Sequence, residues 1–148
     1  NGVEFMITPL ENNKKNLLSL IKTFGGDRFF VTIFAYPKLF RIGADLTKIY
    51  DFKNITDNHD NLFHIKWNGD ETVVIPEVAF SIIDKISQLE KIGVKKFLAD
   101  LSSMNLTKNY YKTIIKTIQN REIIEKFSRF NFKEGFYREK DTLSDEKR

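Results

Sequence analysis

The chain has 148 residues, of which 41% are hydrophobic and 30% charged, a composition typical of one globular domain and not of a disordered chain. It contains no cysteine, which excludes disulfides, thiol nucleophiles and cysteine-ligated zinc or iron–sulfur sites and is compatible with a cytoplasmic location. No apolar run approaches the roughly 18 residues needed to span a bilayer. The net charge of +4 comes from lysines spread among 20 acidic residues, and we expect no membrane partner.

The first 35 residues predict a strand, a helix and a second strand. Residues 2–8 indicate a short buried strand, and Asn12 or Asn13 can cap a helix that continues to about Phe24. Residues 28–35 (RFFVTIFA) are β-branched and aromatic, with apolar side chains on both faces, which is typical of an interior strand of a parallel sheet. Parallel pairing through a right-handed crossover is the default for this order of elements.

The middle of the chain predicts one β-hairpin. Residues 39–42 indicate a short extended piece, and the polar stretch 45–60 indicates an irregular excursion. Side chains then alternate from Leu62 to Trp67, and residues 71–75 return as the partner strand. The Asn-Gly pair at 68–69 accepts the positive φ angles that a tight hairpin turn requires.

The stretch 80–101, FSIIDKISQLEKIGVKKFLADL, predicts a helix, a turn and a strand. Ser81 can cap the helix, Gly93 can end it in a left-handed conformation, and a short strand then ends at Asp100. The apolar residues on one face of the predicted helix are three and four positions apart. They are Ile82, Ile83, Ile86 and Leu89.

The C-terminal part predicts a helix capped by Thr107, with a break or bend at Asn120 and an aromatic segment at 130–137. The lysines of this helix recur every fourth residue and form either a solvated face or a basic surface for nucleic acid. They are Lys108, Lys112 and Lys116. We expect residues 1–138 to form a single α/β domain that is a fragment of a larger protein, and residues 139–148 to be a flexible charged tail.

Four passages of the chain carry a family resemblance. The first is ITPLENNKKNLLSLI followed by RFFVTIFAYPKLFRI, a helix and a strand with Pro-Leu and Pro-Lys-Leu-Phe at matching places. The hairpin FHIKWNGDETVVIP, the stretch 80–101 with its Gly-Val turn and final Asp, and the late segment FNFKEGFY follow in order. Together they resemble the later half of the U32 peptidase family, the collagenase-like proteins.

The resemblance implies an α/β fold with a mainly parallel sheet that forms part of a TIM-like (β/α) barrel, with one β-hairpin and flanking helices. It implies a peptide or RNA substrate, because activities attributed to the family include collagen-type proteolysis and hydroxylation of RNA bases. Several family members hold iron–sulfur clusters through cysteines, and since this chain has none, the resemblance implies no cofactor here. Leu98 stands where the family often has an Arg, which weakens any polar site at that strand end.

Asp100 and the two histidines are the candidates for catalysis or metal binding. Asp100 ends a predicted parallel strand, where α/β folds gather functional groups, or it caps the loop at 102–103. His64 lies on the outer face of a hairpin strand, as a general base, a metal ligand or an ordinary surface residue. His59 stands among acidic residues that form either a metal cluster or a polar loop, and we expect no metal site.

Four further residues are candidates for substrate binding. Tyr36, Lys38 and Arg41 follow the strand 28–35 and can hold an anion or a phosphate, or they are ordinary surface. Trp67 can stack on a nucleic-acid base, or it covers the core at the end of the hairpin.

These observations lead to two hypotheses about function. The first is a segment of a U32 peptidase-like protein that contributes barrel wall and a substrate groove for a peptide or RNA substrate, with the catalytic apparatus mainly outside this chain. The alternative is a non-enzymatic RNA- or protein-binding α/β module. Part of a barrel exposes strand edges, through which a homodimer can form.

Overall fold

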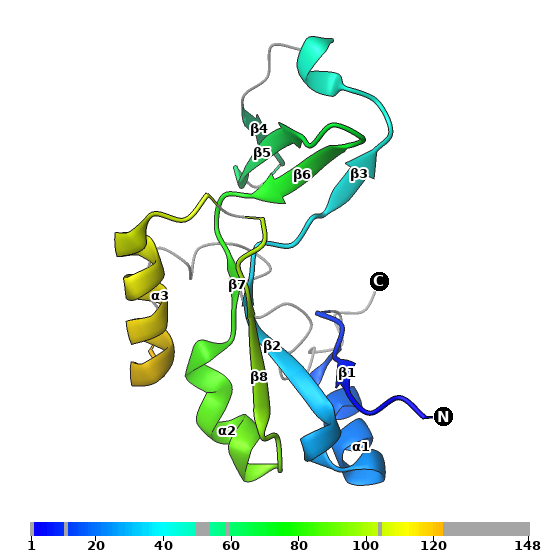
Figure 1. The fold of residues 1–148 in the computed structure, drawn as a ribbon, viewed down its shortest axis with the longest axis vertical. Helices are drawn as coiled ribbons and strands as arrows, with labels where there is room; N and C mark the ends of the chain where they lie inside the picture. The colour runs from blue at the N-terminus through cyan, green and yellow to red at the C-terminus, as the bar shows by residue number, and fades with distance from the viewer. Residues whose placement is uncertain (1, 11, 50–53, 59, 104, 123–148) are drawn as a thin grey trace, which may run out of the picture.

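The computed structural model describes residues 2–10, 12–49, 54–58, 60–103 and 105–122, which form two small β-sheets and three α-helices (Figure 1). None of the helices in these ranges combines the length and apolarity that a membrane crossing demands. In chain order the elements are β1 (Met6–Ile7), α1 (Lys14–Phe24), β2 (Phe29–Ala35), β3 (Phe40–Ile42), β4 (Asn54–Thr56), β5 (Leu62–Trp67), β6 (Thr72–Pro76), β7 (Phe80–Ser81), α2 (Ile86–Lys91), β8 (Lys96–Asp100) and α3 (Lys108–Asn120).

Sheet A is built around β2, which pairs with three other strands. β8 runs parallel to β2 over 30–35, β1 runs parallel to it at 29–30, and β7 runs antiparallel to it at 34–35. A strand has only two edges, so β8 occupies one edge while β1 and β7 share the other. β2 is therefore enclosed on both sides, as its continuous apolar sequence predicts.

Sheet B is antiparallel and has the order β3-β6-β5-β4. The predicted hairpin is confirmed as β5 and β6, which pair from Phe63 opposite Pro76 to Trp67 opposite Thr72. The Asn68 side chain closes the turn by accepting the backbone N–H groups of Asp70 and Glu71. Gly69 takes a φ of 106°, which is the reason for glycine at that position.

The expectation of a mainly parallel sheet forming part of a TIM-like barrel is wrong. Sheet B contains antiparallel pairs alone, and β7 makes sheet A mixed, so that β1–β2 and β2–β8 are the parallel pairs among the described strands. The prediction extended the parallel order of the first 35 residues to the whole chain. The short extended piece predicted at 39–42 is confirmed as β3, while the stretch 45–60, expected to be irregular, contains β4, the other outer strand of sheet B.

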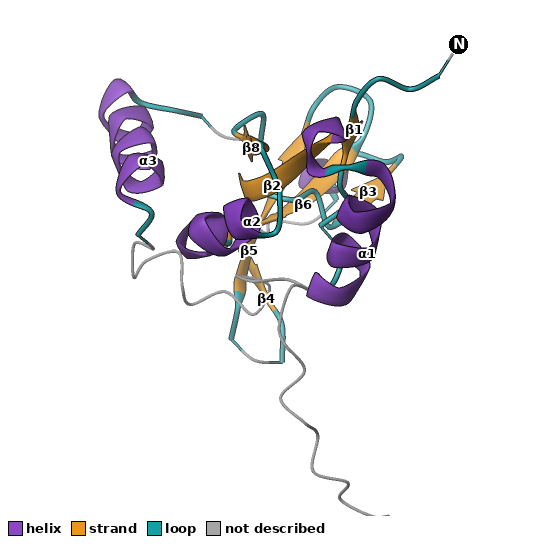
Figure 2. Cartoon of the chain, turned by 90° about the horizontal axis from the view of Figure 1, so that it is seen from below, coloured by secondary structure: helices purple, strands orange, loops and turns teal. Residues whose placement is uncertain are grey.

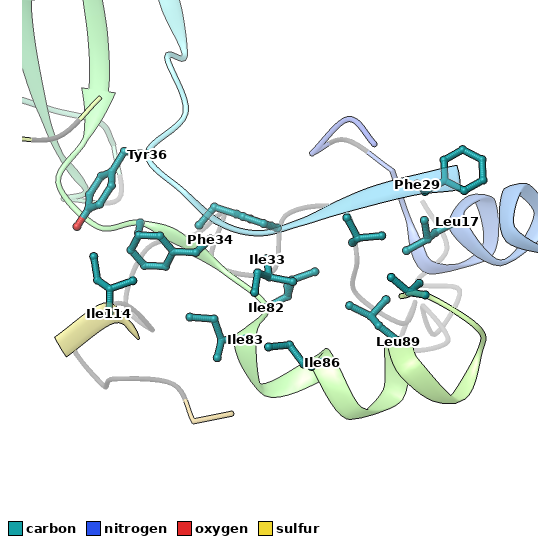
Figure 3. Close-up of a cluster of buried hydrophobic side chains, with 14 of the residues drawn as sticks. Leu17, Phe29, Ile33, Phe34, Tyr36, Ile82, Ile83, Ile86, Leu89 and Ile114 are labelled. Atoms are coloured by element: carbon teal, nitrogen blue, oxygen red, sulfur yellow. The ribbon is translucent and has the colours of Figure 1, made fainter. Parts of the chain in front are cut away.

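The main core lies between β2 and the helices α1 and α2, which pack against the same face of sheet A (Figure 2). Figure 3 shows Ile33 of β2 close to Ile82, and Ile86 and Leu89 below them on α2. Leu17 of α1 belongs to the same cluster. Burying one such side chain, as with the fully buried Leu89, contributes about 1.5–3 kcal/mol.

The turns that follow α1 and α2 touch at two glycines. A Cβ atom on Gly26 would lie 1.9 Å from the carbonyl oxygen of Gly93, so only a residue without a side chain fits there. Gly93 ends the helical segment with a φ of 101°, as predicted from the sequence. This backbone contact fixes where β2 and β8 begin, because each strand follows one of the two turns.

The helix predicted from Ser81 onward is shorter than expected. Ser81 belongs to β7, opposite Phe34, and a 3-10 turn at Ile83–Lys85 precedes α2. Its hydroxyl does not cap the helix and has no hydrogen-bond partner within the described structure, where it is buried. The apolar pattern at Ile82 and Ile83 does not show whether the preceding residues end a strand or begin a helix. The pairing of Phe80 and Ser81 with β2 makes them a strand.

Helix α3 is capped within its own first turn and attached to the rest of the structure at its middle and at its C-terminal end. The Thr107 hydroxyl accepts the backbone N–H of Tyr110, which confirms the predicted cap. Ile114 is buried in the core, and Arg121 at the far end makes two bonds of 2.6 and 2.9 Å to the Glu90 carboxylate of α2. The residues predicted beyond the break at Asn120, namely 123–127, 130–137 and the tail 139–148, lie outside the described residues.

We expect Gly26→Ala to destabilise the chain by about 3 kcal/mol, the upper end of the range for overpacking, because the added Cβ meets backbone that has no rotamer to relieve it. The measurement is the free energy of unfolding in urea. Gly43→Ala is the matched control, because a Cβ at Gly43 meets no atom within 4 Å. Equal stability losses for the two variants would contradict the glycine contact.

Candidate functional site

The carboxyl ends of β2 and β8 bring two of the predicted site residues to the same end of sheet A. Ala35 pairs with Asp100, so Tyr36 follows β2 at the level where β8 ends. Parallel strands of α/β folds present functional side chains at this end of the sheet, the carboxyl end. Two connections, at 36–39 and 77–79, leave the same region for sheet B.

Tyr36 is buried and its phenol is bound to a second tyrosine. Its hydroxyl lies 2.9 Å from the hydroxyl of Tyr110 on α3, and its ring meets Phe34 edge-on with centroids 5.8 Å apart. Burial, the hydrogen bond to Tyr110 and the negative charge of Glu77 raise the pKa of Tyr36 far above its ordinary value, and burial also raises the pKa of Tyr110. Both phenols are therefore protonated at neutral pH, and each is engaged in the hydrogen bond to the other.

Asp100 is occupied by a structural bond. One of its carboxylate oxygens accepts the backbone N–H of Ser102 at 2.9 Å, which is the loop-capping alternative considered from the sequence. The side chain is half-buried. Its catalytic role remains a prediction, and the bond to Ser102 accounts for an Asp at this position without one.

The predicted substrate-binding residues do not form one site. Arg41 lies opposite Val73 and Trp67 lies opposite Thr72, the next residue along β6, so the two side chains are on opposite faces of sheet B. Arg41 is held 3.6 Å from the Glu71 carboxylate. Lys38 is exposed on the connection between the sheets, while Tyr36 is buried.

The histidines and the acidic loop do not assemble a metal centre in the described part of the chain. His64 is exposed opposite Ile75, and Asp57 uses both carboxylate oxygens to bind the backbone and side-chain N–H groups of Asn61. These bonds close the turn between β4 and β5. Among the described residues, no three His, Asp or Glu side chains are grouped as metal ligands, and His59 lies outside those residues.

Sequence reasoning missed an apolar groove between the N-terminal segment and α1. The groove has a volume of about 230 Å³. Its lining is Val3, Glu4, Phe5, Met6, Leu20, Phe24, Arg28 and Phe29. The sequence predicts residues 2–8 as a buried strand, and this is wrong for most of them, since Met6 and Ile7 are 49% and 59% exposed. The signal that could have revealed the groove is the high apolar content of a first strand next to the apolar Leu20 and Phe24 of α1.

The segment beside the groove is firmly attached on its inner side. Phe5 meets Phe30 of β2 edge-on at 5.9 Å, and the Lys96 ammonium lies 3.6 Å above the Phe5 ring while it donates to the Asp27 carbonyl at 2.7 Å. Thr8 donates its backbone N–H to the Phe30 carbonyl. Backbone groups alternate in direction along a strand, so the N–H and C=O of Ile7 point away from β2. In the described structure no strand pairs with that outer edge.

The comparisons with known proteins add no relative. No family model, no curated protein and no solved structure matches the chain. The resemblance to the U32 peptidase family therefore stays a prediction.

The tyrosine pair predicts a pH dependence. The folded pKa of Tyr36 lies above the unfolded value of about 10, so the stability that this shift contributes is complete below about pH 10 and is lost as pH rises further. We expect Tyr36→Phe to cost about 0.5–1.5 kcal/mol at pH 7, from the lost hydroxyl bond, and to make unfolding less steeply dependent on pH above about 10.

The measurement is urea unfolding at a series of pH values between about 9 and 11.5. Tyr111→Phe is the control, because Tyr111 is exposed on the same helix. An alkaline slope that is the same for Tyr36→Phe and Tyr111→Phe would show that burial of Tyr36 has no such effect.

Proposed function

We propose that the chain binds a peptide in extended conformation along the outer edge of β1, as a non-catalytic segment of a U32 peptidase-like protein. The observation that carries this proposal is the position of the apolar groove beside a strand edge that no described strand pairs. A peptide strand added there satisfies the outward N–H and C=O of Ile7, while one of its side chains enters the groove.

The groove supports this proposal through its size and lining. A volume of about 230 Å³ is enough for one large aliphatic or aromatic side chain, and its apolar walls come from both β1 and α1. Main-chain hydrogen bonds of an added strand contribute affinity, and the side chain in the groove contributes specificity. The contacts of Phe5 with Phe30 and Lys96 hold the edge in place before a peptide arrives.

The proposal that this segment is not catalytic rests on the hydrogen bonds that its candidate polar side chains already make. Tyr36 and Tyr110 are protonated and bound to each other, and Asp100 is bound to the loop that follows it. Chemistry on a bound peptide would then require groups from outside the described residues. We place this binding in the cytoplasm, because a chain without cysteine needs no oxidising compartment.

RNA is the second candidate ligand, and one observation favours it. Lys108, Lys112 and Lys116 are all exposed and follow one side of α3. A ligand held by such a stripe makes phosphate contacts, and its affinity falls steeply with salt concentration.

We expect Ile7→Pro to weaken peptide binding by about tenfold, because proline removes the outward N–H that an added strand needs. The probe is a fluorescein-labelled extended peptide with alternating Thr and Val around a central Phe, and the measurement is fluorescence anisotropy. Ile7→Ala is the matched control, since it shortens the same exposed side chain and keeps the N–H. Phe24→Ser tests the groove independently and should also weaken binding.

Equal affinities for Ile7→Pro and Ile7→Ala, or no binding of the peptide by the wild type, would refute strand addition. A labelled oligouridine measured at several salt concentrations tests the RNA alternative in the same assay.

A further inference from the structure

Sheet B has one face that is almost entirely apolar. Residues directly opposite each other on neighbouring strands point to the same face, so the observed register assigns the side chains. Three rows cross the sheet on this face, and we call them together the apolar face. The rows are Ile55–Phe63–Pro76, Phe40–Val74–Ile65 and Ile42–Thr72–Trp67.

The opposite face of sheet B is the one directed at the main core. Val73 and Ile75 lie on it and belong to the buried cluster that includes β2, α1 and α2. Arg41, His64 and Lys66 lie on the same face, on the two strands that flank β6, and are exposed. The apolar face therefore points away from the core of the molecule.

The apolar face is open to solvent at its two outer strands, whereas its residues on β6, namely Thr72, Val74 and Pro76, are buried. Phe40 is 64% exposed, and Ile42 and Ile55 are each 36% exposed. The segment Leu46–Lys48 is bound at the end row of the face, where the Thr72 hydroxyl accepts the Leu46 N–H at 3.0 Å, and Ile49 just beyond is also exposed. Both described helices that pack on a sheet, α1 and α2, lie on sheet A (Figure 1).

This arrangement reverses the usual pattern of an antiparallel sheet. Such sheets place polar residues on the solvated face and apolar residues on the covered face. A sheet with an apolar face is stable when a helix or another sheet covers it. An apolar face left open on a globular chain marks a surface for a partner.

Charge indicates which kind of partner fits. Residues 38–77, which contain sheet B, hold five basic and seven acidic side chains, although the whole chain has a net charge of +4. Arg41 pairs with Glu71, and Lys48 pairs with Asp45. Acidic groups stand at both ends of the sheet in exposed turns and connections. They include Asp70 in the β5–β6 turn, Asp60 in the β4–β5 turn, and Glu77, whose backbone N–H binds the Leu62 carbonyl.

We propose that the apolar face binds a basic amphipathic helix of a partner protein, with the apolar side of the helix on Phe40, Ile42 and Ile55 and its lysines or arginines toward Asp60, Asp70 and Glu77. A helix is the element that usually covers a sheet face in folds that combine both. Acidic surroundings oppose the phosphates of RNA, which need cationic contacts. This surface is separate from the β1 edge and does not depend on the peptide proposed to bind there.

Trp67 supplies a direct measurement of binding, because it is the single tryptophan of the chain and lies on the apolar face. The probe is a synthetic helical peptide with leucines along one side and lysines on the other, and its twin carries glutamates in place of the lysines. We expect the lysine peptide to shift the Trp67 emission to shorter wavelength and the glutamate twin to bind at least about tenfold more weakly.

Three variants locate the binding. Phe40→Asp should weaken it by about tenfold, because a charge replaces an exposed apolar contact. The combined change Asp60→Asn, Asp70→Asn and Glu77→Gln should weaken it by about threefold and reduce its salt dependence while leaving every apolar side chain in place. Lys66→Ala, on the opposite face, is the matched control and should leave the affinity within about twofold.

Three results of these binding measurements would overturn the proposal. The lysine peptide could leave the Trp67 emission unchanged, the glutamate twin could bind equally well, or oligouridine could bind more tightly than the peptide. A wild-type dimer in light scattering that becomes a monomer in Phe40→Asp would show instead that a second copy covers this face. Thermal unfolding of each variant verifies its fold, and the neutralised triple variant gives a result that does not depend on Phe40.

Discussion

The burial of β2 is the constraint on which the rest of the structure depends. Its residues from Phe29 to Ala35 are apolar on both faces apart from Thr32, and they need cover above, below and at both edges. β8 encloses one edge, β1 and β7 divide the other, and α1 and α2 cover one face. The contact between Gly26 and Gly93 is what lets both helices reach that face, because it brings the turns after them together.

The two surfaces proposed for binding follow from this arrangement. The inner edge of β1 pairs with β2. The outer edge of β1 therefore keeps backbone groups that no described strand pairs, and it lies beside the groove against α1. Sheet B contributes Val73 and Ile75 to the same core through one face, and its other face remains apolar and partly open. Both surfaces are therefore the reverse sides of elements whose inner sides complete the core.

The region between the sheets has a structural role that its residue types do not reveal. A buried tyrosine and an aspartate at the ends of parallel strands are the kind of residues expected in a catalytic site. Here Tyr36 binds Tyr110 and attaches α3 to the end of β2, and Asp100 binds the loop that leads to the same helix. Both contacts place α3 beside α2, where Arg121 reaches Glu90.

Local chemistry in the sequence determined several elements, because the residues that cause them are neighbours in the chain. Asn13 and Thr107 cap their helices, Asn68 and Gly69 form the hairpin turn, and Gly93 ends the helical segment before β8. The sequence also identified β2 as the enclosed strand from its unbroken apolar run. It did not determine how the strands combine, nor which candidate side chains would meet.

Tertiary structure alone decided those points, because they depend on pairings between distant residues. The three-residue strand β4 is too short to show a pattern, and only pairing with β5 makes it a strand. The strand register along β6 places Arg41 and Trp67 on opposite faces of sheet B. The hydrogen bond between Tyr36 and Tyr110, which are 74 positions apart in the chain, attaches α3 to the end of β2. The groove needs both β1 and α1, and the apolar face needs four strands in register, so neither exists until the chain has folded.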